Sequence, residues 1–546
     1  MILILISTIF IFPVLIGIGK IAENFSGILC KGISGKILLG ILAISVIWTV
    51  AAFFIPLNIV VEIPTVIAGL IYFFKNKLYW ELYRFSKKEY LLFLVISLII
   101  FFCSSFYPYI LDHFGYYIPT IKWLNEYGLV KGIANLDLTL GQMSVWHVFQ
   151  AGFSNFSDPF LRINSILLII FTLYIIENKA WIHLCFLPVL LLFSQSPSPD
   201  LPVVIFSLIM VNEIMKGNTR ISLLFTFSVF VFAIKPTMIW LPVLSFLYSI
   251  FIIKSNFKNL IPGILIILLF FIKNIYTFGY PVFPVSIMDF NVSWKSNPEI
   301  LRTSSQYAIQ KTYDMQYSYE EIQKFSARDY IKNWLFLNGI KSKINILFVV
   351  SLIIFTCFSL IKKNKIISLI CISLIIKSIL VLLFSAQYRF FIDVFFVIIF
   401  VTLIHIFNQK RAIICFSILS IIFTGLITFP NILQTYLPSF KLGNFMGKFE
   451  IKQLYKPSIY EYNKFQFYKI GNLKFNVSKK YPYNFDTQLP SISESFIYDD
   501  IKADIFPQMI DENNIKKGFI WKKLDIKEKK EAENIINSIS NSYIQK

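Results

Sequence analysis

The residues best suited to chemistry stand just after an apolar run that ends near Phe106, where Asp112 and His113 are adjacent. A carboxylate at such a place can remove a proton from a hydroxyl group or bind a divalent cation. The aromatic and apolar residues from Tyr117 to Tyr127 recur at near-helical spacing, which predicts an amphipathic helix at a membrane surface. The alternative interpretation is that Asp112 only caps this helix.

A second acid and three cations lie at the ends of other apolar runs. Asp200 follows the proline-rich stretch SQSPSP, either as a second ligand in the same cavity or as a helix N-cap. Lys235, Lys273 and Arg389 are expected at a similar depth on the same side. A lipid-linked phosphate needs such charges, and arginine binds a pair of phosphate oxygens well. The alternative is that the three cations only reach lipid headgroups.

Aromatic side chains in the same regions can stack on sugar rings. Tyr116 follows Asp112 closely, and Trp294 lies in a later polar segment, so both are candidate substrate-binding residues. The sequence contains no phosphate-binding glycine loop, zinc-protease motif or serine-hydrolase elbow in a supporting context. This absence argues against an ATP-driven pump and against a serine hydrolase.

The elements that position these residues must be membrane helices. Of 546 residues, 56% are hydrophobic and only 15% are charged, and the mean hydropathy is +0.67. A soluble protein carries roughly 25% charged residues, so a soluble enzyme is excluded. Lys377 lies within an apolar run, where an isolated charge is costly, and we expect it to pair with Asp393 or Glu62.

Apolar runs long enough to cross a bilayer number about 14, the shortest being Trp181–Phe193 and Leu223–Ile234. With the N-terminus outside, every gap assigned to the inside contains Lys or Arg. This is the positive-inside pattern. The 51 basic residues therefore indicate membrane orientation rather than nucleic-acid binding.

Three segments then fall outside the membrane on one side. They are the loops 107–158 and 277–343 and the tail beyond residue 430. The tail contains strand-like alternation at Lys464–Tyr468 and Leu473–Val477, and a helix is expected near Ile526–Ile539. The predicted fold is an all-α polytopic membrane domain over residues 1–430 and a small α+β extracytoplasmic domain over 431–546.

The pattern of many spans and an acid opening a long outer loop with interfacial helices resembles the GT-C glycosyltransferases. These membrane enzymes use polyprenyl-phosphate-linked sugars. Particular phrases also resemble an uncharacterised family of bacterial multispanning proteins of cell-surface polysaccharide pathways. The matching phrases are DHFGYYIPTIKWLNEYGLVKGIANL, SQSPSPDLPV, GYPVFPVS with WKSNP, and QYRFF.

The GT-C resemblance implies an inverting glycosyltransferase in the bacterial cytoplasmic membrane. Asp112 occupies the place of the catalytic acid of the outer loop, and His113 stands where many members have a second acid. The implied partners are a lipid-linked sugar donor, a glycan or lipid acceptor and membrane lipids. No organic cofactor is implied, and a divalent cation, Mg²⁺ or Mn²⁺, is one expectation.

Two other functions stay open at this point. A polysaccharide polymerase or ligase acting on a lipid-linked glycan also needs a large outer loop with basic residues. A transporter or flippase of lipid-linked glycan would break no bond, and such proteins more often show internal repeats and broken spans at the membrane midplane.

Overall fold

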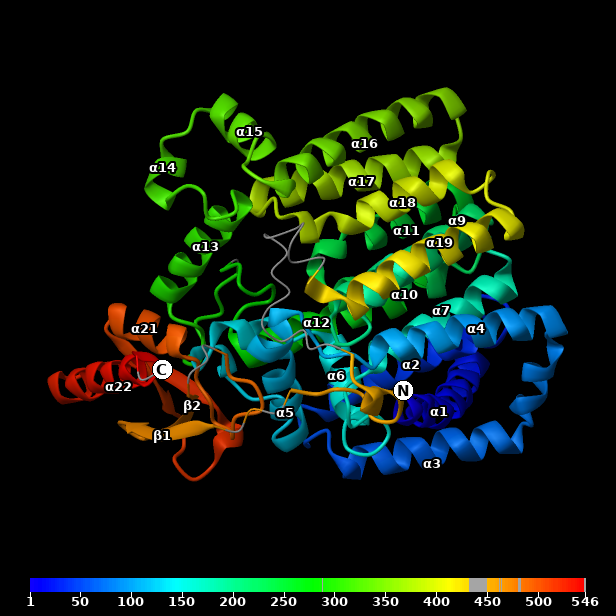
Figure 1. Cartoon of the computed structure of the whole chain (residues 1–546). Coiled ribbons are helices and arrows are strands. Elements are labelled where there is room, and N and C mark those ends of the chain that lie inside the picture. Colours follow the sequence, from blue (N-terminus) through cyan, green and yellow to red (C-terminus); the bar gives the residue numbers. More distant parts are fainter. Residues whose placement is uncertain (287, 432–448, 461, 463, 480–482, 545–546) are drawn as a thin grey trace.

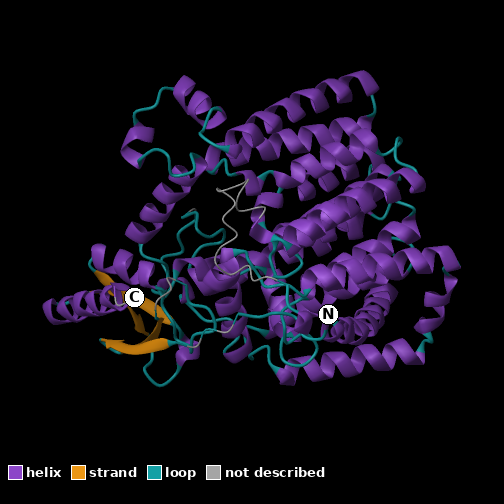
Figure 2. Ribbon diagram, in the orientation of Figure 1, coloured by secondary structure: helices purple, strands orange, loops and turns teal. Residues whose placement is uncertain are grey.

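The computed structural model describes residues 1–546 except 287, 432–448, 461, 463, 480–482 and 545–546. Helices account for most of the described chain, and its strands all lie beyond residue 460 (Figure 2). The long helices lie side by side in one bundle, while short helices, loops and the strands gather at one end of it (Figure 1). The predicted helical membrane domain and the small C-terminal strand region are thereby confirmed in outline.

Seven helical segments in the described chain are long and apolar enough to cross a membrane. They are α1 (Ile2–Ser26), α2 (Ile33–Ala51), α11 with its flanking turns (Pro236–Ile253), α12 with its preceding turn (Phe257–Phe278), α16 (Ile340–Lys362), α17 (Lys365–Phe384) and α19 (Gln409–Thr428). The structure therefore supports a multi-pass membrane protein. It does not confirm the predicted count of about 14 spans.

The difference arises because several apolar runs form shorter elements. A helix of 14 residues covers about 21 Å, less than the roughly 30 Å of a bilayer core. The run Trp181–Phe193 is divided into two 3₁₀ turns around the four residues of α8 (Leu187–Leu190). The remaining short helices with apolar runs are α3 (Ile59–Lys75), α7 (Ile163–Asn178), α9 (Asp200–Met215), α10 (Ile221–Ile234) and α18 (Ile392–Leu403).

The N-terminal helices pack through glycines. A Cβ on Gly17 of α1 would lie 2.0 Å from the carbonyl oxygen of Gly69 in α3. A Cβ on Gly40 of α2 would lie 2.2 Å from the carbonyl oxygen of Leu15 in α1. Without side chains at these points the backbones approach closely, as is usual between membrane helices.

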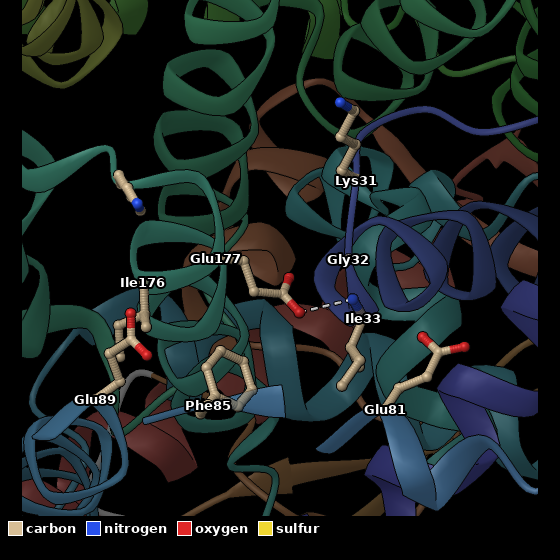
Figure 3. Close-up of a pocket in the computed structure, with 9 residues that line it drawn as sticks. Lys31, Gly32, Ile33, Glu81, Phe85, Glu89, Ile176 and Glu177 are labelled. Carbon is tan, nitrogen blue, oxygen red and sulfur yellow. Dashed lines mark hydrogen bonds between the residues drawn. The ribbon is translucent and has the colours of Figure 1, made fainter. Parts of the chain in front are cut away.

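Gaps predicted to lie on the inside meet at one end of the bundle. A pocket of about 250 Å³ there is lined by residues of three of them, including Lys31, Glu81 and Lys179 (Figure 3). The Glu177 carboxylate lies at its wall and accepts hydrogen bonds from the backbone amides of Ile33 and Ser34 at 2.7 and 2.9 Å. These bonds satisfy the N-terminus of α2, so we assign the pocket a structural role.

The two loops and the tail gather at the opposite end of the bundle (Figure 1). The first loop follows α4 (Lys87–Ser104) and contains α5 (Ile118–Glu126) and α6 (Val145–Phe153). The second contains α13 (Pro298–Thr312), α14 (Tyr319–Gln323) and α15 (Ala327–Leu335). The predicted amphipathic helix after Asp112 thus forms as α5, and its inner face is buried.

Beyond residue 448, the described part of the tail forms two antiparallel strand pairs and two helices. Strand β1 (Phe465–Ile470) pairs with β2 (Leu473–Ser478), and β3 (Ile505–Met509) pairs with β4 (Phe519–Lys523). The helices are α21 (Glu494–Lys502) and α22 (Ile526–Ile544). The predicted strands near Lys464–Tyr468 and Leu473–Val477 and the closing helix are confirmed. The second pair was not predicted, because β3 is buried at every residue and shows no alternation.

A buried ion pair joins the two helices that flank Arg389. Lys377 of α17 donates to Asp393 of α18, and their side chains are only 1% and 4% exposed. The second carboxylate oxygen of Asp393 accepts from the Trp240 indole at 2.9 Å. Asp393 is therefore the partner of Lys377. Glu62 instead accepts from the backbone amides of residues 156 and 157.

Replacing Lys377 by Met should destabilise the chain by about 3–5 kcal/mol, because the buried Asp393 carboxylate loses its counter-charge. The double variant Lys377→Met with Asp393→Asn should recover much of this loss. Thermal unfolding of the detergent-purified protein measures the effect, with Lys365→Met at the exposed start of α17 as control. Equal unfolding temperatures for Lys377→Met and wild type would contradict the assigned structural role.

Candidate functional site

Asp112 lies where the first loop turns into its surface helix. It precedes one π-helical turn, His113–Tyr117, and makes no side-chain capping hydrogen bond to that turn. Its carboxylate instead accepts from the Arg389 guanidinium, with Oδ2 and Nη1 3.2 Å apart. Both side chains are 37% exposed. The capping interpretation of Asp112 is therefore not what the geometry favours.

Arg389 comes from the short segment between α17 and α18. It lies in a 3₁₀ turn, Tyr388–Phe390, and its guanidinium lies over the Phe390 ring at 5.0 Å. Its Nε is buried and has no hydrogen-bond partner within the described chain. Arg389, 277 positions away from Asp112 in the sequence, is thus held beside it and has a hydrogen-bond donor that is still available.

The second predicted acid and the first predicted cation form another ion pair next to Arg389. Lys235, which follows α10, donates to the Asp200 carboxylate at the start of α9. The same ammonium lies 3.5 Å from the carbonyl oxygen of Arg389. Asp112, Asp200, Lys235 and Arg389 therefore belong to one cluster of alternating charges.

The proline-rich SQSPSP stretch ties this cluster to the first loop. The Ser196 hydroxyl lies 3.0 Å from Nδ1 of His113, and the Tyr117 hydroxyl donates to Ser198 at 3.3 Å. Ser198 in turn donates to the Asp200 carboxylate at 3.5 Å. The serines orient both segments through hydrogen bonds, a role that composition alone did not reveal.

Burial sets the protonation of the first-loop groups. The pKa of Asp112 is raised by burial, an effect that the positive charge of Arg389 partly opposes and the Asp200 carboxylate reinforces. The pKa of His113 falls well below its usual value, again mainly because of burial. Its imidazole is therefore neutral near pH 7, which suits it to orient Ser196 rather than to hold an anion.

Tyr116 lies next to the cluster, whereas two other predicted residues have structural partners. Burial, and then the charge of Asp112, raises the pKa of Tyr116. Lys273 is buried in α12 and donates to the carbonyl oxygen of Met143 at 2.8 Å. Trp294 donates to the carbonyl oxygen of Ile275 at 3.2 Å. Within the described chain, neither Lys273 nor Trp294 contacts Asp112 through a hydrogen bond or an ion pair.

One cation of the site was missed from the sequence. Lys311 lies near the end of α13 and is close enough to Arg389 and Asp112 for both charges to act on it. Burial, and then repulsion by Arg389, lowers the pKa of Lys311. The regular polar pattern of Pro298–Thr312 predicts a solvated helix, and only the folded second loop brings its last turn to Arg389.

A divalent cation does not fit the acids of this cluster. Asp112 and Asp200 are each paired with a base, and the adjacent His113 contacts Ser196. No group of three His, Cys, Asp or Glu side chains in the described chain is arranged to hold a metal ion. We therefore assign the cluster no metal-dependent step.

The tail is fastened to the first loop by a buried carboxylate. The buried Asp137 carboxylate accepts from Asn484 at 2.9 Å and from Ser493 at 3.0 Å through Oδ2. Its Oδ1 accepts from the backbone amide of Thr139 at 2.9 Å. One carboxylate thus satisfies donors from two parts of the tail, and its removal would leave both buried without a partner.

Asp137→Ala should therefore loosen the tail, with a loss of about 1–3 kcal/mol for each donor left unsatisfied. Limited proteolysis of the detergent-purified protein should release tail fragments faster than in wild type. Glu512→Ala, at an exposed position of the tail, is the matched control. Equal cleavage rates for the Asp137 variant and wild type would show that the carboxylate does not anchor the tail.

Comparison with known proteins assigns most of the membrane part of the chain to a family. Neither the curated proteins nor the solved structures include a match. A model for a domain of unknown function, DUF8201, matches residues 1–396. The match includes both loops, Asp112, Asp200, Lys235, Lys311 and Arg389. The chain therefore belongs to the DUF8201 family.

Proposed function

We propose that the protein is an inverting glycosyltransferase of GT-C type. It would transfer a sugar from a polyprenyl-phosphate donor to a cell-envelope glycan or lipid. The observation that carries the proposal is the ion pair of Asp112 and Arg389, with the Lys235–Asp200 pair beside it. A partly exposed carboxylate stands beside a guanidinium, a group well suited to bind phosphate, at the loop end of an apolar bundle.

In this mechanism the donor phosphate replaces Asp112 as the partner of Arg389. The carboxylate is then free to accept the proton of the acceptor hydroxyl. The hydroxyl oxygen bonds to the anomeric carbon as the bond from that carbon to the phosphate oxygen breaks. The electron pair leaves with the polyprenyl phosphate, whose growing charge Arg389 and Lys311 stabilise. Attack opposite the leaving group inverts the anomeric configuration.

The charges of the cluster, taken together with Lys311, fit such a donor. Arg389, Lys235 and Lys311 carry three positive charges against two on Asp112 and Asp200, which leaves one positive charge. A polyprenyl-phosphate sugar is a phosphodiester and carries one negative charge. The bound donor would therefore neutralise the site.

Loss of the protein should leave its donor unused. Deleting the gene in the organism that encodes it should cause a polyprenyl-phosphate-linked sugar to accumulate and a surface glycan to lose that sugar. Mass spectrometry of extracted lipids and of released glycans measures both. An unchanged lipid-linked sugar pool together with an unchanged glycan would contradict the proposal.

The loops and tail are proposed to lie on the outer face of the bacterial cytoplasmic membrane. Three of the gaps that contain Lys or Arg meet at the other end of the bundle, which favours that end as cytoplasmic. Alkaline phosphatase fused after Lys546 should therefore be active, and a cytoplasmic fluorescent reporter at the same place should be dark. A fluorescent fusion without phosphatase activity would reverse the orientation and remove Asp112 from the outer face.

A further inference from the structure

A pocket of about 260 Å³ lies on the second-loop side of Arg389. The end of α13, the start of α16 and the segment before α18 form its walls. Its charged and amide side chains are those of Lys311, Asp314, Lys341, Asn345, Gln387 and Arg389. The pocket thus brings three cations and one carboxylate together from segments far apart in sequence.

The pocket walls are fixed by hydrogen bonds within the protein. The backbone amide of Ala386 donates to the Thr312 hydroxyl at 3.2 Å, and the Ser385 hydroxyl donates to the carbonyl oxygen of residue 308 at 3.1 Å. The Trp334 indole donates to the carbonyl oxygen of Ala386 at 3.0 Å. These bonds attach α13 and α15 to the segment that carries Arg389, so the pocket is preformed.

Its positive charges are only partly neutralised. Lys341 forms an ion pair with Asp314, which uses the one carboxylate of the pocket. The Lys311 ammonium makes no hydrogen bond or ion pair within the described structure, and the buried Nε of Arg389 has no partner there. Burial, and then repulsion by Arg389, lowers the pKa of Lys311. An anion between these two side chains would remove that repulsion and take up the free donors.

We infer that this pocket binds a phosphate group through Lys311 and Arg389, with Lys341 as a further source of positive charge. The inference rests on the proposed function and deepens it, because Arg389 also contacts Asp112. A phosphate in the pocket would take over Arg389 from Asp112 and leave the proposed base free beside it. The phosphate is either the headgroup of a polyprenyl phosphate or free inorganic phosphate, and both have the same recognition chemistry.

Binding to the full-length protein in detergent distinguishes these sources. Dissociation constants are measured from ligand-dependent thermal unfolding, with undecaprenyl phosphate in mixed micelles and with inorganic phosphate at constant ionic strength. Lys311→Gln should weaken binding at least about tenfold, the scale of one charge-assisted contact. Lys332→Gln, at an exposed position of α15 in the same loop, should bind as wild type does.

Lys311-dependent binding of undecaprenyl phosphate alone supports the pocket as a lipid headgroup site. Lys311-dependent binding of inorganic phosphate supports it as a site for the phosphate group itself. Equal affinity of Lys311→Gln and wild type for both probes, or no binding of either probe to wild type, would overturn the inference. Sugar transfer that depends on Asp112 would still support the proposed function in that case, so the two failures are distinguishable.

Discussion

Asp112→Asn should reduce sugar transfer by at least about 10²-fold, the usual scale for losing acid–base catalysis. The amide is similar in size to the carboxylate and can still accept a hydrogen bond from Arg389, but it cannot take a proton from the acceptor. Asp112 makes no capping bond to the following turn, so folding and membrane insertion should be retained. The surface glycan of a strain with this variant as its only copy measures the effect.

Protein level must be measured in the same strain, because loss of protein would also alter the glycan. Asp314→Asn is a useful control, since Asp314 is a pocket carboxylate that pairs with Lys341 rather than Arg389. It should retain far more transfer than Asp112→Asn. A wild-type glycan at normal level of the Asp112→Asn protein would eliminate Asp112 as the base.

The pH dependence of transfer should follow the same carboxylate. A base acts in its deprotonated form, so the rate should fall as the pH drops through the pKa of Asp112. Burial raises this pKa from the ordinary value of an aspartate, which moves the fall to higher pH. The residual activity of Asp112→Asn should lack this acidic limb, and an unchanged limb would assign it to another group.

Arg389→Ala should lower the efficiency of donor use by about 10- to 100-fold, because one or two charge-assisted hydrogen bonds to the phosphate are lost. Arg389→Lys should lose less, since it keeps the charge but not the planar pair of donors. Initial rates at varied donor concentration separate the two. Arg302→Ala is the control, because Arg302 lies exposed on α13 and pairs only with Glu299 in the described structure.

Equal activity of Arg389→Ala, Arg389→Lys and wild type would show that Arg389 only reaches lipid headgroups. The same result would also show that the contact with Arg389 does not hold the Asp112 carboxylate in the position that transfer requires. If Arg389→Ala lowered the efficiency of donor use no more than Arg302→Ala does, Arg389 would likewise have no specific role in donor binding.

The sequence predicts elements better than it predicts their partners. Apolar runs identify the membrane helices, and alternation identifies β1 and β2, because both patterns are local. The length of an apolar run does not show whether the run forms one continuous helix or several short turns. Trp181–Phe193 contains Pro188 and breaks into three short turns, which is one reason why the predicted number of spans exceeds the seven long segments of the described structure.

The sequence predicts those residues of the candidate site that are charged and stand at the end of an apolar run. Asp112, Asp200, Lys235 and Arg389 come together as two ion pairs. For Lys273, the predicted depth in the membrane was not sufficient to predict a place in the site. Depth does not specify the face of α12 on which the side chain lies, and Lys273 points to Met143. Lys311 was missed because its approach to Arg389 depends on how the whole second loop folds.

The central claim is that the protein transfers a sugar from a polyprenyl phosphate with Asp112 as the base. The most direct measurement uses the purified protein in liposomes made from the lipids of the deletion strain, with glycan acceptor from the same strain. Wild type should convert the polyprenyl-phosphate-linked sugar to polyprenyl phosphate as the acceptor gains one sugar for each donor consumed, and Asp112→Asn should not. A donor pool that stays constant with wild type, or is consumed equally by Asp112→Asn, would contradict the claim.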